Sequence, residues 1–280
     1  MDQEKIASLE AFARQIRVET LRELADAGNG HVGGALDLAD VLAVLYRDSM
    51  RVDPVRPDDP DRDYLVLSKG HAGPVLYAAL ALMGYFPMEQ LKTLNKPGTK
   101  LPSHCDRCKT RGVDMTAGSL GQGISAALGI ALGNKTAGRD NDTYCIIGDG
   151  EMDEGSVWEA MLLAPQFGLN HLTVIVDNNG LQIDGPTRDI VNLGDISQKA
   201  VAFGWYTLDV DGHDVEALSE AIALAKKAKK PAFINMHTVK AKGWPKYENQ
   251  LGCHHVKFIS REEAEAAIAA LEQAPGAVES

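Results

Sequence analysis

Two short apolar runs in the middle of the chain, each followed at once by a polar turn, constrain the fold most strongly. Residues 144–147 lead into a Gly-Asp-Gly turn at 148–150, and residues 172–176 lead into Asp-Asn-Asn-Gly at 177–180. The second run is rich in β-branched residues, as is typical of a parallel strand buried on both faces. Helical and strand patterns alternate on either side of these runs, with short turns between them. The sequence therefore predicts an α/β fold with an open, mostly parallel sheet and helices on both faces.

The predicted elements cover most of the chain. We expect helices over residues 4–27, 36–47, 72–83, 155–167, 195–203, 214–229 and 260–272, and strands over residues 64–68, 144–147, 172–176, 205–210 and 232–237. The first helix has apolar side chains at helical spacing and is expected to end at Gly28. The segment 52–63 is rich in proline and aspartate and is expected to be a loop.

The charge balance argues against two classes of partner. Lys and Arg number 28 and Asp and Glu 39, giving a net charge of -11, whereas nucleic acid and anionic membrane surfaces favour a cationic face. No run approaches the roughly 18 apolar residues of a membrane span, and the first residues are polar, unlike a signal peptide. We therefore expect a soluble, cytoplasmic protein with neither nucleic acid nor membrane as a partner.

The four cysteines predict no disulfide framework and no zinc clip. Cys145 lies in an apolar run and is expected to be a buried small hydrophobe. Cys105 and Cys108 form a Cys-x-x-Cys pair beside His104, but no second pair at suitable spacing follows. The pair is therefore expected to be incidental to function.

The two polar turns together predict a cofactor site. Ligands of open parallel sheets bind beyond the carboxyl ends of the strands, where Asp149 and Asn179 offer the hard oxygens that Mg²⁺ or Ca²⁺ prefers. The 27 residues 151–177 leave room for one helix and one returning strand, so the turns should lie side by side. The pair resembles the thiamine diphosphate and metal motif of the thiamine-dependent enzymes.

Three histidines and one glycine-rich segment narrow the resemblance. His31 lies in Gly-His-Val-Gly-Gly, His71 in Ser-Lys-Gly-His-Ala, and His104 follows Leu-Pro-Ser, while Gly-Ser-Leu-Gly-Gln-Gly at 118–123 opens an apolar helix. With the two polar turns, these pieces resemble transketolase, in particular the N-terminal subunit of split transketolases. The match is collinear from about residue 10 to residue 255.

The resemblance implies a role for each matching residue. A metal ion, Mg²⁺ or in its place Ca²⁺ or Mn²⁺, would be bound by Asp149, the side-chain oxygen of Asn179 and the backbone carbonyl of Leu181. Thiamine diphosphate would contact His71, Gly118, Leu120, Asp149, Gly150, Asn179, Ile183 and His254. The catalytic set would be His31, His71, His104, His254 and Glu154, with Glu154 at an interface that links two active sites. Histidine pKa values near 6.5 would suit proton transfer at neutral pH.

The chain departs from the family pattern at two histidines. Ser103-His104-Cys105 stands where the family usually has Gly-His-Pro. The histidine that contacts the donor sugar in the family is kept, but it lies in a chemically different turn. The late histidine is followed by a second one, so either His254 or His255 could make the cofactor contact. The spacing from Glu248 and Asn249 favours His254.

The resemblance implies half of an enzyme. Residues 1–280 would form a single thiamine diphosphate and Mg²⁺ binding domain, with the pyrimidine-binding and C-terminal domains on a separate chain. With that partner, in a two-plus-two heterotetramer, the protein would transfer a two-carbon ketol unit from a ketose to an aldose, with phosphorylated or otherwise anionic sugars as substrates. The alternatives are an oxo-acid dehydrogenase α-subunit, a deoxyxylulose-phosphate-synthase-like protein, or a non-catalytic subunit that binds the cofactor as a scaffold.

Overall fold

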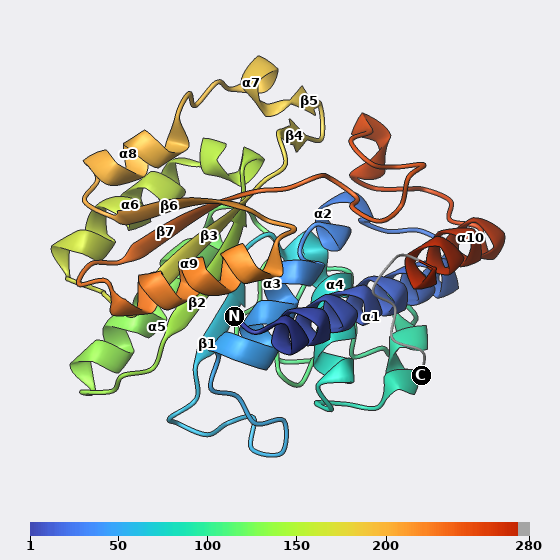
Figure 1. Ribbon diagram of the computed structural model, residues 1–280, viewed down its shortest axis with the longest axis horizontal. Coiled ribbons are helices and arrows are strands. Elements are labelled where there is room, and N and C mark those ends of the chain that lie inside the picture. The colour runs from blue at the N-terminus through green and yellow to red at the C-terminus, as the bar shows by residue number, and fades with distance from the viewer. Residues whose placement is uncertain (274–280) are drawn as a thin grey trace.

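A five-stranded parallel sheet forms the centre of the molecule (Figure 1). The computed structural model describes residues 1–273. The strands run in the order β1-β2-β3-β7-β6, and every neighbouring pair is parallel. Their bounds are Tyr64–Leu67 (β1), Thr143–Gly148 (β2), Leu172–Asn178 (β3), Tyr206–Asp211 (β6) and Ala232–His237 (β7). All five predicted strands are present, and the expected fold class is confirmed.

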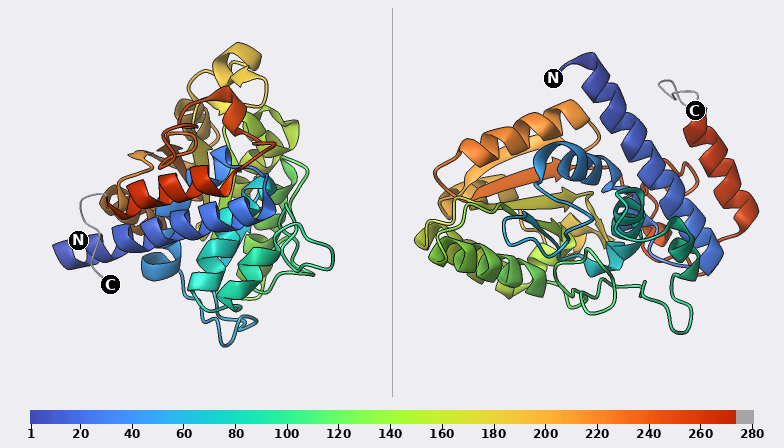
Figure 2. Two further views of the ribbon diagram at one scale, coloured as in Figure 1. Left: turned by 90° about the vertical axis from the view of Figure 1, so that its right-hand side faces the viewer. Right: turned by 90° about the horizontal axis from the view of Figure 1, so that it is seen from below.

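Helices cover both faces of the sheet (Figures 1 and 2). Because side chains alternate along a strand, Tyr144 and Ile146 of β2 join one core while Cys145 and Ile147 join the other. The first core is completed by α1 (Gln3–Ala27), α3 (Ala39–Val44), α4 (Gly73–Leu82) and α9 (Val215–Lys227), and the second by α5 (Gln122–Thr136), α6 (Gly155–Gln166) and α8 (Ile196–Ala202). The α10 helix (Arg261–Glu272) packs along α1.

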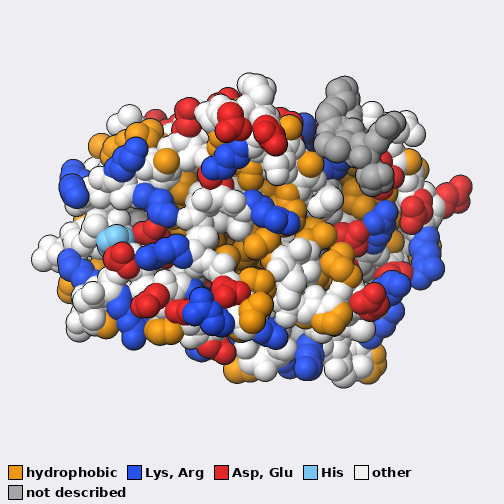
Figure 3. Space-filling view, turned by 60° about the horizontal axis from the view of Figure 1, so that its bottom comes forward, with side chains coloured by type: hydrophobic (Ala, Val, Ile, Leu, Met, Phe, Trp, Pro, Cys, Tyr) orange, Lys and Arg blue, Asp and Glu red, His pale blue; other side chains and the backbone are white. Residues whose placement is uncertain are grey.

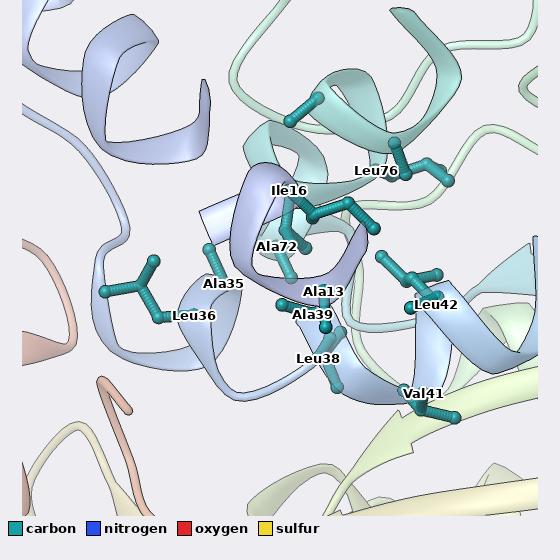
Figure 4. Packing of buried hydrophobic residues seen from close by; sticks show 14 of the residues in the cluster. Ala13, Ile16, Ala35, Leu36, Leu38, Ala39, Val41, Leu42, Ala72 and Leu76 are labelled. Carbon is teal, nitrogen blue, oxygen red and sulfur yellow. The ribbon is translucent and has the colours of Figure 1, made fainter. Parts of the chain in front are cut away.

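The α1 helix begins and ends where its sequence predicts. The Asp2 side chain accepts a hydrogen bond from the Lys5 amide at 2.8 Å, and Gly28 closes the helix at a φ of 76° that disfavours residues with a Cβ. In between, Ala13 and Ile16 face buried side chains of the neighbouring helices, which Figure 4 shows at close range.

The prediction of one continuous helix over residues 36–47 is wrong. The chain forms a short helix, α2 (Gly33–Leu36), then α3, and then a π-helical turn over Leu45–Ser49. The break falls at Asp37, whose buried carboxylate accepts a hydrogen bond from the distant Ala241 amide at 2.7 Å. Almost every residue here is buried, so no polar face marked the break in the sequence.

The sheet places the two polar turns together. Gly148 at the end of β2 pairs in register with Asp177 of β3, which confirms that the turns lie side by side. Beyond β3, the chain forms a hairpin that the sequence did not predict, from β4 (Leu181–Gln182) and β5 (Gly185–Pro186), followed by α7 (Thr187–Ile190). The hairpin therefore lies at the carboxyl edge, where parallel sheets bind ligands.

The helices and one face of the surface can be compared with what a membrane or a nucleic acid would require. Within residues 1–273, no helix is both long and apolar enough to cross a membrane. On the face shown in Figure 3, cationic and anionic side chains are interspersed around a central group of hydrophobic ones. No single-sign cationic field of the kind that nucleic acid favours stands out on that face.

Candidate active site

A cavity of about 380 Å³ opens at the carboxyl edge of β2 and β3. Its size lies within the range of small-molecule sites. Eleven residues singled out from the sequence line it: His31, His71, His104, Gly118, Leu120, Asp149, Gly150, Asn179, Leu181, Ile183 and His254. Glu154 is not among the lining residues; it is exposed at the N-terminus of α6. The tertiary structure therefore gathers the predicted set with one exception.

Backbone hydrogen bonds hold three of the motifs against one another. The Cys105 amide donates to the Gly70 carbonyl at 3.4 Å, and the Ala117 amide donates to the Cys105 carbonyl at 3.0 Å. A Cβ on Gly70 would overlap the Ala117 carbonyl, so only glycine permits this approach. As a result His71, which follows Gly70, shares the cavity with His104.

A second pair of backbone bonds brings the remaining histidines to the same place. Gly30 and Val256 exchange hydrogen bonds of 3.0 and 2.9 Å, which carries His31 toward the late segment. The ring centroids of His31 and His254 lie 5.5 Å apart, and those of His71 and His254 lie 5.0 Å apart. His255 is outside the lining set although its ring lies 4.6 Å from that of His31.

The cavity holds its imidazoles in the neutral form. Burial, reinforced by neighbouring histidines, lowers the pKa of His31 to about 3, and burial beside Lys240 lowers the pKa of His254 to about 4. Burial also lowers the pKa of His71 and His104. The expected pKa near 6.5 is therefore wrong for these four residues. The Nδ1 atoms of His31 and His254 are buried without a hydrogen-bond partner, an arrangement unusual for buried polar atoms.

Because His31 is neutral in the folded chain, we expect the free energy of unfolding to fall in acid. In the unfolded chain His31 binds a proton below a pH of about 6.5. In the folded chain it binds a proton only when the pH falls to its lowered pKa of about 3. The free energy of unfolding therefore falls on acidification across this window. Urea denaturation at pH 7.5 and pH 5 should show a smaller loss for His31→Gln than for the unsubstituted chain.

The matched control for this prediction is Leu120→Ala, which alters another cavity residue that cannot titrate. It should keep the full pH dependence of the unsubstituted chain. Equal losses for His31→Gln and the unsubstituted chain would contradict the prediction.

Three oxygen atoms at one end of the cavity form a donor set suited to a divalent cation. The Asp149 carboxylate accepts hydrogen bonds from the Gly150 amide at 2.8 Å and the Gly180 amide at 2.7 Å. Asn179 accepts at Oδ1 from the Leu181 amide at 3.0 Å, and the Leu181 carbonyl accepts from Lys240 Nζ at 2.7 Å. These are hard oxygens, and a lysine ammonium already bonds to one of them. Asp149, Asn179 and Leu181 all line the cavity and therefore offer the oxygen chemistry that a divalent cation prefers.

Sequence reasoning missed several buried charged residues around this end. Lys69 is 2% exposed and forms an ion pair with Asp177, which is fully buried. Burial opposes the charge of Lys69, but Asp177 and Asp37 raise its pKa above the ordinary value. Lys69 lies just after β1 and Asp177 lies at the carboxyl end of β3, a signal that could have identified them. Nothing in the local sequence links Asp37 or Lys240 to the site.

Glu151 is a further residue that the sequence did not single out. Its carboxylate accepts hydrogen bonds from Ser68 Oγ, from the Gly121 amide at 2.8 Å and from the Gly148 amide at 3.1 Å. It thereby ties the end of β2 to the glycine-rich segment before α5.

The cysteines lie partly as expected. Cys145 is fully buried within β2, as predicted. Cys105 is also buried, which raises its pKa to about 12, whereas Cys108 is exposed. All four cysteines are free thiols.

The fold and the cavity define an α/β protein with a ligand-sized cavity at the carboxyl edge of its parallel sheet. A family model described as "Transketolase, thiamine diphosphate binding domain" matches residues 8–274. The chain therefore belongs to the transketolase family. The resemblance drawn from the motifs, and with it the expected enzyme class, is confirmed.

Individual relatives support the same assignment. The chain is 49% identical to the 6-deoxy-6-sulfo-D-fructose transketolase subunit SqwG of Clostridium sp. (strain MSTE9), over 96% of this chain and 98% of that protein. It is 34% identical to an apulose-4-phosphate transketolase subunit of Phocaeicola vulgatus, over 90% of this chain and 89% of that protein. It superimposes on transketolase from Campylobacter jejuni with a TM-score of 0.88 and 31% identity, covering 98% of this chain and 43% of the other.

The lengths of these proteins divide into two groups. This chain spans almost all of the two proteins named as subunits, but only 40% of mouse transketolase, to which it is 39% identical. Among the thiamine-dependent classes weighed from the sequence, these matches favour transketolase over the oxo-acid dehydrogenase and deoxyxylulose-phosphate-synthase alternatives.

Proposed function

We propose that the chain binds thiamine diphosphate and Mg²⁺ in the 380 Å³ cavity and serves as one subunit of a two-chain transketolase. Asp149, Asn179 Oδ1 and the Leu181 carbonyl bind the metal, for which Ca²⁺ or Mn²⁺ can substitute. The observation that carries the proposal is the convergence of these three oxygens with four histidines in one cavity.

The remaining lining residues hold the cofactor. His71, Gly150, Asn179 and His254 contact the diphosphate, while Gly118, Leu120 and Ile183 contact the rest of the molecule. Lys69 and Lys240, both in the lining, add positive charge at the diphosphate end. Thiamine diphosphate supplies the carbon nucleophile and electron sink that ketol transfer requires.

The histidines act on the substrates as neutral imidazoles. His31, His71, His104 and His254 each present a nitrogen to the cavity that can accept a proton or hydrogen-bond a sugar hydroxyl. The low pKa values of His31, about 3, and His254, about 4, keep both rings uncharged at neutral pH, so each can accept or donate a hydrogen bond without carrying a charge. Their joint role is to move protons and orient the sugar while the cavity limits contact with water.

The reaction is transfer of a two-carbon ketol unit from a ketose to an aldose. The names of two relatives, which include a sulfo-sugar and a sugar phosphate, support an anionic sugar as substrate. A cytoplasmic location agrees with the four free cysteines, since disulfides are rare in that compartment.

The partner is a second chain that carries the pyrimidine-binding and C-terminal domains, assembled with this one as a two-plus-two heterotetramer. The match to 40% of mouse transketolase supports this division. On this proposal, residues 1–280 form one cofactor-binding domain, and Glu154, exposed at the start of α6, lies at the interface between active sites.

The test is reconstitution. The purified chain is expected to show no ketol transfer alone and to gain it on mixing with the partner chain, thiamine diphosphate and Mg²⁺, assayed against a panel of anionic ketose donors and aldose acceptors. Full transfer by this chain alone would refute the two-chain proposal. Cofactor binding without transfer by the assembled complex would instead favour the scaffold alternative.

A further inference from the structure

Asp37 joins three segments that meet beside the cavity. It lies at the break between α2 and α3 and is 0% exposed. Its Oδ2 atom accepts a hydrogen bond from Asn179 Nδ2 at 3.0 Å, and its Oδ1 atom accepts one from the Ala241 amide at 2.7 Å. One carboxylate thus connects the helix break, the turn after β3 and the loop that carries Lys240.

The hydrogen bonds around Asn179 fix which way its amide points. Its Nδ2 atom faces two carboxylates, Asp37 at 3.0 Å and Asp177 at 3.3 Å, and both accept hydrogen bonds. Its Oδ1 atom lies on the other side, where it accepts from the Leu181 amide at 3.0 Å. A reversed amide would turn an oxygen toward both carboxylates and lose these bonds.

We propose that Asp37 is a positioning residue that holds the Asn179 amide with its oxygen toward the metal. The inference rests on the proposed function, because it takes Asn179 Oδ1 to be a metal ligand. Asp37 touches neither metal nor substrate in this role and acts only through Asn179. Partners of this kind orient metal ligands in proteins, and their loss typically costs about 10–100-fold in metal affinity.

Asparagine cannot replace Asp37 in this role, although it has nearly the same shape. The site requires two acceptor atoms, one for Ala241 and one for Asn179, whereas an asparagine side chain has a single acceptor oxygen. With its oxygen kept for the Ala241 amide, the substituted side chain would present an NH₂ group to Asn179. The Asn179 amide would then lose its hydrogen bond to position 37 and keep only the 3.3 Å bond from Nδ2 to Asp177 to fix its orientation.

The test compares Mn²⁺ binding by the chain, assembled with its partner chain, in the presence of saturating thiamine diphosphate, with free Mn²⁺ measured by electron paramagnetic resonance. Asp37→Asn is expected to weaken Mn²⁺ binding at least about tenfold. The exchanged pair, Asp37→Asn with Asn179→Asp, keeps the total charge and restores a donor opposite an acceptor. It should therefore bind Mn²⁺ more tightly than either single variant.

A matched control separates this effect from general destabilisation. Asp63 is also 0% exposed and accepts two backbone hydrogen bonds of 2.8 Å, from Arg51 and Asp142, away from the cavity. Asp63→Asn should lower the thermal unfolding midpoint and leave the Mn²⁺ affinity unchanged.

The outcomes distinguish failure of the proposed function from failure of the inference about Asp37. Absence of Mn²⁺ binding by the unsubstituted chain would count against the proposed function. Normal binding by that chain and by Asp37→Asn alike would overturn only the inference about Asp37. If Asp37→Asn does not fold, the exchanged pair is compared with Asn179→Asp alone, and equal affinity of those two would also overturn it.

Discussion

Replacing Asp149 by alanine is expected to lower ketol transfer by the reconstituted enzyme about 1,000-fold. A bound metal ion contributes several kcal/mol to charge stabilisation, and each 1.36 kcal/mol corresponds to about tenfold in rate. Asp149 supplies the carboxylate of the predicted ligand set and is held by the Gly150 and Gly180 amides. The loss should appear in steady-state assays and in calorimetric titration of Mg²⁺ with thiamine diphosphate.

The control for this prediction is Asp140→Ala, which removes an exposed carboxylate that pairs with Arg51. It should retain activity and cofactor binding. Circular dichroism should show that Asp149→Ala still folds. An Asp149→Ala enzyme with nearly normal transfer would refute the assignment of Asp149 to the metal.

Replacing Asp177 by alanine is expected to destabilise the fold by about 3–5 kcal/mol, because it leaves Lys69 as a buried charge without its partner. Lys69 is 2% exposed and Asp177 is 0% exposed, so bulk water screens the remaining charge only weakly. Asp177 also accepts a hydrogen bond from Thr238 Oγ1, which the substitution removes as well. Urea denaturation followed by circular dichroism measures the effect.

A double variant tests the cause of that loss. Lys69→Met with Asp177→Leu removes both charges together, and such replacements of buried pairs are often neutral or stabilising. The double variant should therefore be more stable than Asp177→Ala. Lys246→Met, which breaks an exposed ion pair with Glu263, should leave the unfolding transition close to that of the unsubstituted chain. A double variant no more stable than Asp177→Ala would show that the lone charge is not the cause.

Local patterns in the sequence were sufficient for most of the fold. The β-branched run of β3 and the apolar run of β2 predicted two buried parallel strands, and their spacing predicted that they are neighbours. Gly28 marked the end of α1 because a left-handed residue closes a helix there. The break between α2 and α3 was missed; Asp37 at the break accepts a hydrogen bond from the amide of Ala241, 204 residues further along the chain, which no local pattern reveals.

The candidate site was predicted less completely than the fold. Asp149 and Asn179 could be identified because they follow strands directly, and the histidines because they stand in distinctive glycine-containing segments. The ionisation of His31 and His254 could not be predicted, because their pKa values, about 3 and about 4, depend on burial and on one another.

The sequence by itself determined the parallel sheet, the family and eleven of the residues that line the cavity, since each depends on short motifs at fixed spacing. The tertiary structure alone decided which charges surround those residues. Lys69, Asp177, Asp37 and Lys240 come from four separate segments and meet only when the chain folds. Hydrogen bonds and electrostatic interactions depend on distances in space, which the order of residues along the chain does not specify.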